Sequence, residues 1–319
     1  MPLSARAERE RARESLPGST LFGCRRFREP NVPRGVTMGL FRMPWESAPE
    51  VAPEPPPMTL LISQERLLPI LLPYAALMAL QYAGLAYARR STGPLGVAPL
   101  AFGHFLATLV AFTVLAVVGT YSWNYVEGPS DHVWGFGSWG RWICELQVAF
   151  MSYEMTAIAM AKGRERQLLC GPGGVMIVHH LLVLVLGWVI AANSFLHYHS
   201  TFFFGVPELS SVPLAFMDFF KQNKELMKRY PVANEVSRVT FAVAFLYVRT
   251  ILFTKATFDL FSDSLAEFAT GLTGMRWALL SFICGSELVL LGMQYFWSAK
   301  IVNGLILLAK GKPPANKYE

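Results

Sequence analysis

Long runs of apolar residues constrain this chain more than any other feature of its sequence. Residues 67–88 (LLPILLPYAALMALQYAGLAYA) carry no charge, and other windows of similar length are also apolar on every side. A run of about 20 apolar residues matches the ~30 Å hydrocarbon core of a bilayer, whereas a soluble domain alternates apolar and polar positions. With 53% hydrophobic and 16% charged residues, the chain is predicted to be an all-α, polytopic transmembrane helix bundle.

About seven spans are expected within a transmembrane domain covering 59–310, although about six to eight would fit the same hydropathy. The spans are 66–88, 98–120, 142–161, 174–194, 201–220, 239–258 and 277–309. Pro207 and Pro213 lie in the fifth span and are expected to break or kink it, because proline cannot donate a backbone hydrogen bond.

Charges between the spans predict the orientation of the chain. Basic residues occupy every second loop and the tail: Arg89 and Arg90; Lys162, Arg164 and Arg166; Lys221, Lys224, Lys228, Arg229 and Arg238; and Lys310, Lys312 and Lys317. The positive-inside rule therefore places these loops and the C-terminus in the cytosol. The net charge of +6 is explained by topology signals and headgroup contacts, so no nucleic-acid partner is predicted.

The two ends of the chain differ from the apolar middle. Residues 1–58 are rich in arginine and, at 53–57, in proline. Their apolar content is too low to offset the entropy of ordering, which predicts a disordered segment. A targeting peptide is the alternative, although such peptides contain few acidic residues. Residues 311–319 are expected to form a short, basic cytosolic tail.

Two adjacent histidines, His179 and His180, stand near the start of an otherwise apolar span. Ionisable groups inside a membrane are costly and indicate function by default. Adjacent helical positions point about 100° apart, so one ring can face a cavity while the other contacts a neighbouring helix. Neutral imidazole can act as a base or a nucleophile near pH 7. The alternative is a pair of structural histidines hydrogen-bonded between helices.

Among the charged residues within predicted spans, three are candidates for an ion pair. Arg249 needs a carboxylate or a lipid phosphate as its partner, and Glu154 and Glu208 are the candidates. Glu208 follows Pro207, so it could bind backbone amides freed by the proline, orient one of the histidines, or bind a headgroup amine. A structural ion pair and a catalytic role are both compatible with these positions.

The other histidines do not predict a metal site. His197 and His199 lie about 17 residues after the adjacent pair, or ~25 Å along a helix, so the two pairs cannot share one ion. His132 lies between tryptophans and indicates an interfacial belt. His104 is expected to form a hydrogen bond between helices. The four cysteines are far apart and show no metal or disulfide spacing.

The order of these polar residues carries a resemblance to a known family. They are His104, Tyr153-Glu154, His179-His180, the segment 207–211 (PELSS), and Phe245 with Arg249. This order resembles the TLC domain, the family of ceramide synthases, translocon-associated TRAM proteins and CLN8-like lipid regulators. The resemblance covers roughly 60–310 of this chain.

The resemblance implies a role in lipid homeostasis and residence in the endoplasmic reticulum. Ceramide synthases join a fatty acyl group from acyl-CoA to a sphingoid amine. His179 and His180 match their histidine pair and Glu208 matches their glutamate. The acidic residues that precede this glutamate in ceramide synthases are absent here, and Glu154 stands where many members carry aspartate. The sequence therefore resembles a divergent member and not a typical ceramide synthase.

Two functions are weighed on this basis. The first is binding or regulation of membrane lipids within the bundle. The alternative is an intramembrane acyltransferase, for which acyl-CoA would be the co-substrate; no bound cofactor and no metal are predicted. The catalytic candidates are His179, His180, Glu208 and Glu154, and the substrate-binding candidates are His104, Tyr153, Arg249 and Ser210. A homo-oligomer and a transporter are left open.

Overall fold

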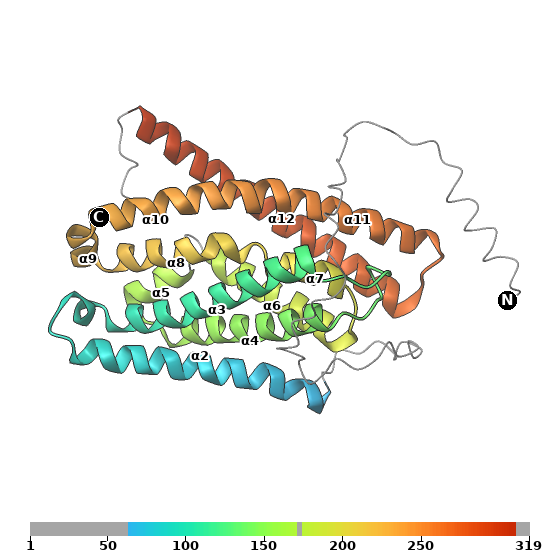
Figure 1. Ribbon diagram of the computed structural model, residues 1–319, viewed down its shortest axis with the longest axis horizontal. Helices are drawn as coiled ribbons and strands as arrows, with labels where there is room; N and C mark the ends of the chain where they lie inside the picture. The colour runs from blue at the N-terminus through green and yellow to red at the C-terminus, as the bar shows by residue number, and fades with distance from the viewer. Residues whose placement is uncertain (1–62, 171–173, 311–319) are drawn as a thin grey trace, which may run out of the picture. The chain divides into compact units, whose positions relative to one another are not determined.

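The structure is a computed structural model that describes residues 63–170 and 174–310. The predicted disordered segment 1–58 and the tail 311–319 lie outside the described residues. Within the described ranges the chain forms helices and turns, with no strand (Figure 1). The expectation of an all-α fold is confirmed for this part of the chain.

The helices follow one another in an up-and-down order. They are α2 (Gln64–Arg90), η1 (Pro94–Val97), α3 (Pro99–Tyr125), α4 (Ser138–Met160), α5 (Gly163–Cys170), α6 (Val175–Asn193), α7 (His197–Phe203), α8 (Glu208–Gln222), α9 (Lys224–Arg229), α10 (Pro231–Ala244), η3 (Phe245–Leu252), α11 (Phe253–Ala269) and α12 (Gly274–Ala309). The segments α10, η3 and α11 continue directly into one another, and η3 is a π-helical stretch.

Five helices in the described residues are long and apolar enough to cross a membrane. They are Gln64–Arg90, Pro99–Tyr125, Val175–Asn193, Pro231–Ala269 and Gly274–Leu307. Five of the predicted spans coincide with these helices, but the full count of seven is not found. The predicted spans 142–161 and 201–220 correspond to α4 and to α7 with α8, which fall outside this set.

Helix α4 is long enough to span a bilayer, since its 23 residues rise about 34 Å. It packs against α2, α3, α6 and α7, and most of its residues are buried, including Glu145 and Glu154. Neighbouring helices cover α4 on several sides, so it can carry polar residues that a lipid-facing helix could not. This central position explains how α4 can carry two buried glutamates.

The predicted fifth span is divided into two helices. Helix α7 ends at Phe203 and α8 begins at Glu208, so the predicted break at Pro207 is confirmed. The predicted break at Pro213 is wrong, because α8 continues through that residue. A single proline removes one backbone hydrogen bond, and packing of α8 against α3 and α10 holds the helix together. With 15 residues, α8 rises only about 22 Å.

Small residues allow one close approach at the centre of the bundle. A Cβ placed on Gly119 of α3 would lie 2.3 Å from the Cα of Gly205, in the turn between α7 and α8. Such contact is closer than any side chain permits, so both glycines are needed for the two backbones to meet. This packing fixes the turn that begins α8, and it thereby positions Glu208.

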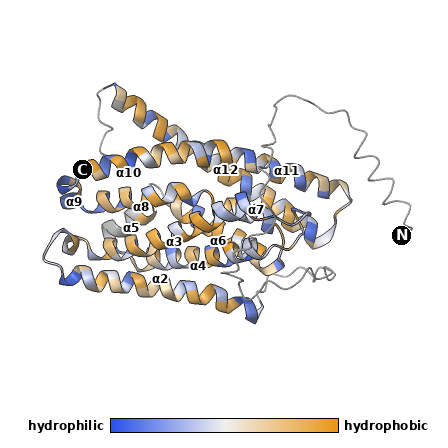
Figure 2. Cartoon of the chain, in the orientation of Figure 1, coloured by the Kyte–Doolittle hydropathy of each residue, from blue (hydrophilic) through white to orange (hydrophobic). Residues whose placement is uncertain are grey.

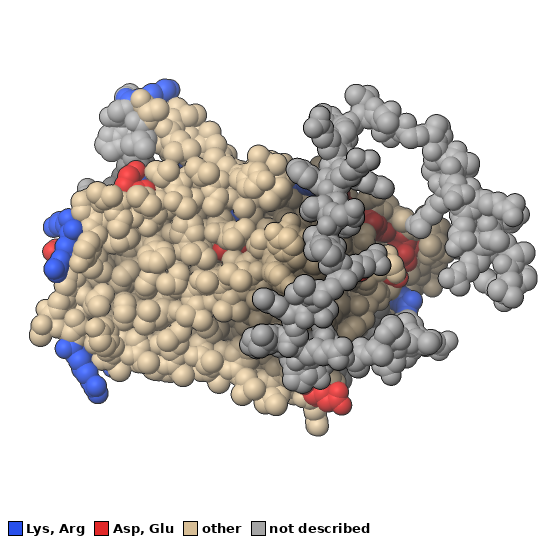
Figure 3. Space-filling view, viewed as in Figure 1, with Lys and Arg blue, Asp and Glu red and all other residues tan. Residues whose placement is uncertain are grey.

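Polar and charged residues gather at the two ends of the bundle, while the helices between them are mainly hydrophobic (Figure 2). Lysines and arginines lie at the end where α2 finishes and α9 stands, on the left in Figure 3. These include Arg89, Arg90, Lys162, Lys224, Lys228 and Arg229. The basic loops predicted to share one side of the membrane therefore do lie at one end of the structure.

Candidate functional site

A cavity of about 390 Å³ lies inside the helix bundle. Side chains from α3 to α8, α10, η3, α11 and α12 line it. Its volume falls within the range of about 300–1,000 Å³ that is usual for small-molecule sites. The cavity is elongated, since on α6 the lining runs from Met176 to Ile190, about 21 Å of helical rise.

The two halves of the cavity differ in polarity. On α6, His179 and His180 line the half nearer the basic end, and Val183, Leu186 and Ile190 follow on later turns. Two other segments show the same change from polar to apolar lining. On α3, His104 is followed by Phe112. On the continuous η3 and α11, Arg249 is followed by Phe253 and Leu260. The polar exceptions in the deeper half are Gln147, Glu287 and, on α7, His199 and Ser200. The cavity is therefore suited to an amphipathic molecule.

His104 and Glu154 form the first polar contact in the cavity wall. The Nε2 atom of His104 lies 3.2 Å from Oε1 and 3.4 Å from Oε2 of Glu154. Their side chains are only 16% and 6% exposed. The predicted interhelical hydrogen bond of His104 is thus present, between α3 and α4. Glu154, one of the two predicted partners of Arg249, is therefore paired with His104.

Tyr153 does not line the cavity, although it was predicted to bind substrate. Its side chain is fully buried, and its hydroxyl donates a hydrogen bond to Oε1 of Gln81 on α2. Its ring stacks against His104, with 6.0 Å between the ring centroids. Tyr153 therefore supports His104 from behind the cavity wall.

The adjacent histidines both line the cavity. The ring centroids of His179 and His180 are 5.6 Å apart, and His179 makes an edge contact with Trp297 of α12 at 5.4 Å. The Nδ1 atoms of both histidines are buried and have no hydrogen-bond partner among the described residues. Unpaired buried nitrogens are costly, so a bound polar group at this position would be stabilised.

Arg249 is the centre of the second polar group. Its Nε donates to Oγ of Ser210 at 2.8 Å, and its NH2 atom donates to Oγ of Ser211 at 2.9 Å. The same NH2 atom lies 3.5 Å from Oε1 of Glu208. Of the two predicted partners, Glu208 is therefore the one in contact. Arg249 belongs to the π-helical η3, and such segments often occur at functional sites.

Sequence reasoning gave no role to three residues that the structure places in the cavity wall. Glu287 lines the deeper half, and Thr257 approaches its Oε1 at 3.5 Å. Asp218 and Ser211 line the half that also contains Arg249. For the two acids, the available signal was a carboxylate inside a predicted apolar span. Ser211 belongs to the segment 207–211 of the family resemblance, but its residue type alone gave no signal, because serine is common in membrane helices.

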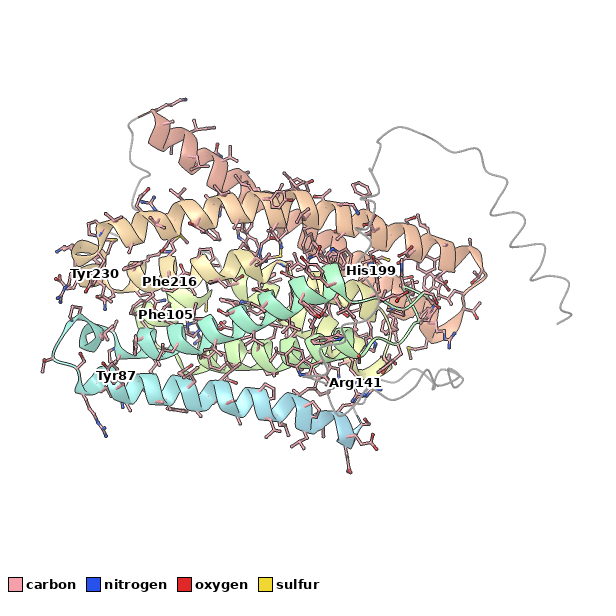
Figure 4. All side chains as sticks on the ribbon, in the orientation of Figure 1. Tyr87, Phe105, Arg141, His199, Phe216 and Tyr230 are labelled. Carbon is pink, nitrogen blue, oxygen red and sulfur yellow. The ribbon has the colours of Figure 1, made fainter. Side chains whose placement is uncertain are left out.

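Exposed lysines show where the cavity meets the surface. Lys221, at the end of α8, and Lys300, in the last part of α12, are both exposed and line the cavity. Phe105 and Phe216 pack edge to face near this end, with centroids 5.1 Å apart (Figure 4). An anionic group would be attracted to this basic opening.

The second histidine pair occupies the opposite end, on α7, outside the five candidate spans. The backbone amide of Gly137 donates to Nδ1 of His197 at 3.0 Å. His199 lines the cavity.

Comparison with protein-family models finds a match over the part of the chain that contains the polar residues of the cavity. The model of the TLC domain (TRAM, LAG1 and CLN8) matches residues 100–303, more than half of the 319-residue chain. Comparisons with curated proteins and with solved structures give no match. The matched range contains every cavity-lining residue described above. The chain therefore belongs to the TLC domain family and is an integral membrane protein.

Proposed function

We propose that this protein binds a membrane lipid inside the helix bundle and acts in lipid homeostasis. The observation that carries the proposal is the polarity of the cavity, with an apolar half lined by Leu186, Ile190 and Phe253. An acyl chain in this half would bury apolar surface, which is favourable by roughly 25 cal/mol per Å². The headgroup would then lie among the histidines, the carboxylates and Arg249.

Lipid retained by the purified protein tests this proposal. Leu186→Trp fills the apolar half, because Leu186 is buried and lines the cavity. Its control is Val185→Trp, which adds the same bulk on the outward side of α6, where Val185 is 38% exposed. We expect mass spectrometry of lipids extracted after detergent purification to find a lipid class that is lost only in Leu186→Trp. Equal lipid content in both variants would contradict binding in this cavity.

The second candidate is acyl transfer, favoured by the unpaired Nδ1 atoms of His179 and His180. An imidazole nitrogen could attack the thioester carbonyl of acyl-CoA, with CoA thiolate leaving, and pass the acyl group to an amine or hydroxyl. The exposed Lys221 and Lys300 would attract the CoA phosphates. Alternatively, the histidine would take the proton of the attacking amine as a general base.

Whole-lipid mass spectrometry separates the two candidates. Cells would express the wild type or the His179→Ala/His180→Ala variant at matched levels. A class of acylated lipid that rises only with the wild type supports transfer and names the substrate class. Acyl transfer is contradicted if both proteins change lipids equally. Retained lipid in the purified double variant would then favour binding.

We further propose seven crossings, in which α4 is the third along the chain and α7 and α8 together are the fifth. The basic end, including the C-terminus, would face the cytosol from the endoplasmic reticulum. Single cysteines at exposed Lys224 and exposed Glu127 test this orientation in sealed microsomes whose cytosolic face is outside. An impermeant maleimide should label the cysteine at position 224 and not that at 127. Labelling of both or only of 127 would contradict it.

A further inference from the structure

Three side chains far apart in the sequence meet at the end of the bundle opposite the basic loops. His132 lies in the loop between α3 and α4, His199 on α7, and Asp263 on α11. Oδ2 of Asp263 is 2.9 Å from Nδ1 of His132 and 3.0 Å from Nε2 of His199. One ligand atom of each residue lies within 4.8 Å of the other two. Figure 4 labels His199 at this end.

We propose that His132, His199 and Asp263 bind a divalent transition-metal ion, with Zn²⁺ as the preferred ion. Two imidazole nitrogens and one carboxylate oxygen are typical zinc ligands, and three protein ligands leave a fourth position for water. Sites built from oxygen alone would favour Mg²⁺ or Ca²⁺, whereas imidazole favours zinc and its neighbours in the transition series.

The three ligand side chains are held in place by their neighbours, and two of them are partly exposed to solvent. The His199 side chain is 2% exposed, whereas those of His132 and Asp263 are 39% and 33% exposed. The ring of His132 stacks on that of Tyr198, with centroids 3.8 Å apart and planes 8° from parallel. An ion could therefore enter from the solvent side and meet rings that are already held in place.

The loop that carries His132 is also held by its own hydrogen bonds. Oδ1 of Asp131 accepts the backbone amides of Val133 and Trp134 at 3.0 and 2.8 Å. In addition, the indole Nε1 of Trp134 donates to Oε2 of Glu267 on α11 at 2.8 Å. The loop is thus closed by its own hydrogen bonds and joined to α11 beside the proposed site, which limits the rearrangement needed for binding.

The geometry also sets the expected strength of binding. Ligands about 2.0–2.2 Å from a tetrahedral zinc ion are roughly 3.3 Å apart. The distances of 2.9 and 3.0 Å between Oδ2 of Asp263 and the two histidine nitrogens would therefore lengthen by only a few tenths of an ångström. Nδ1 of His199 is buried and has no hydrogen-bond partner among the described residues. Supporting hydrogen bonds to ligating histidines are commonly worth about 10–100-fold in affinity. We therefore expect micromolar binding.

Equilibrium dialysis against Zn²⁺ tests the site in the full chain, purified in detergent and first treated with a chelator. The wild type should bind one equivalent, and Co²⁺ should give the visible absorption of a four-coordinate ion. Asp263→Asn removes the anionic ligand, and His132→Gln removes a partly exposed ligand from a loop. Each should weaken binding about tenfold or more, while circular dichroism shows an unchanged helix content.

The matched control is Asp259→Asn, one turn earlier on the same helix. Asp259 pairs with Lys255 at 2.6 Å and is not one of the three ligands, so this variant should bind zinc like the wild type. The proposal is overturned if the wild type binds no metal at micromolar concentrations. It is also overturned if Asp263→Asn and His132→Gln both bind as tightly as Asp259→Asn. Asp263 would then serve only as a hydrogen-bond acceptor for the two histidines.

Discussion

Removal of the buried arginine should destabilise the bundle more than any surface change. Arg249→Met eliminates the bonds to Ser210 and Ser211, and it leaves Glu208 with no cationic partner among the residues that the structure describes. The side chains of Arg249 and Glu208 are 11% and 9% exposed. Breaking one partner of a buried pair costs about 3–5 kcal/mol, because the other charge remains desolvated.

A double-mutant cycle isolates the ion pair from the serine contacts. Glu208→Gln alone should also be destabilising, since it leaves the guanidinium uncompensated. The double variant Glu208→Gln/Arg249→Met contains neither charge, so its loss should be smaller than the sum of the two single losses by about 1–3 kcal/mol. Unfolding in mixed micelles with increasing dodecyl sulfate, followed by circular dichroism, measures each free energy.

An exposed pair at a similar distance provides the control for this cycle. Glu225 lies 3.6 Å from Lys228, but their side chains are 59% and 73% exposed. Glu225→Gln should therefore leave the unfolding transition nearly unchanged, since solvent screens such pairs. Losses that add within about 0.5 kcal/mol in the cycle would refute the reasoning, because they would show that the two buried charges do not interact.

Three further variants test the packing and the cavity. Gly119→Val places side-chain atoms against the backbone of Gly205 and should cost about 1–3 kcal/mol or more in the same unfolding assay; an unchanged transition would refute the close packing. Asn223→Ala removes the amide that donates to the carbonyl of Pro94 at 2.6 Å and should cost about 1–3 kcal/mol, whereas a loss near zero would contradict that role. Leu186→Trp should abolish copurified lipid, as described above, and lipid content like that of the wild type would count against the cavity.

Local composition was sufficient to predict the class of fold. Hydropathy is a sum over neighbouring residues, so five of the predicted spans coincide with helices able to cross a membrane. The break at Pro207 was also predictable, because the backbone chemistry of proline acts locally. Pro213 could not be judged in this way, since contacts of α8 with other helices decide whether the helix continues.

The pairing of polar residues was less accessible from sequence. Both Glu154 and Glu208 were candidates to pair with Arg249, and only the helix arrangement assigns Glu154 to His104 and Glu208 to Arg249. Residue types and spacing fix which groups must find partners inside a membrane. They do not fix which helix faces which, so either assignment was compatible with the same sequence.

The sequence by itself determined that this chain is an all-α membrane protein and that its polar residues follow the order found in TLC domains. Only the tertiary structure decided that α4 lies among other helices, that the polar and apolar linings occupy different halves of one cavity, and that His132, His199 and Asp263 meet. The physical reason is the sequence separation of the residues involved. Burial of a segment in lipid depends on that segment's own side chains. A cavity or a set of metal ligands depends instead on contacts between residues more than sixty positions apart.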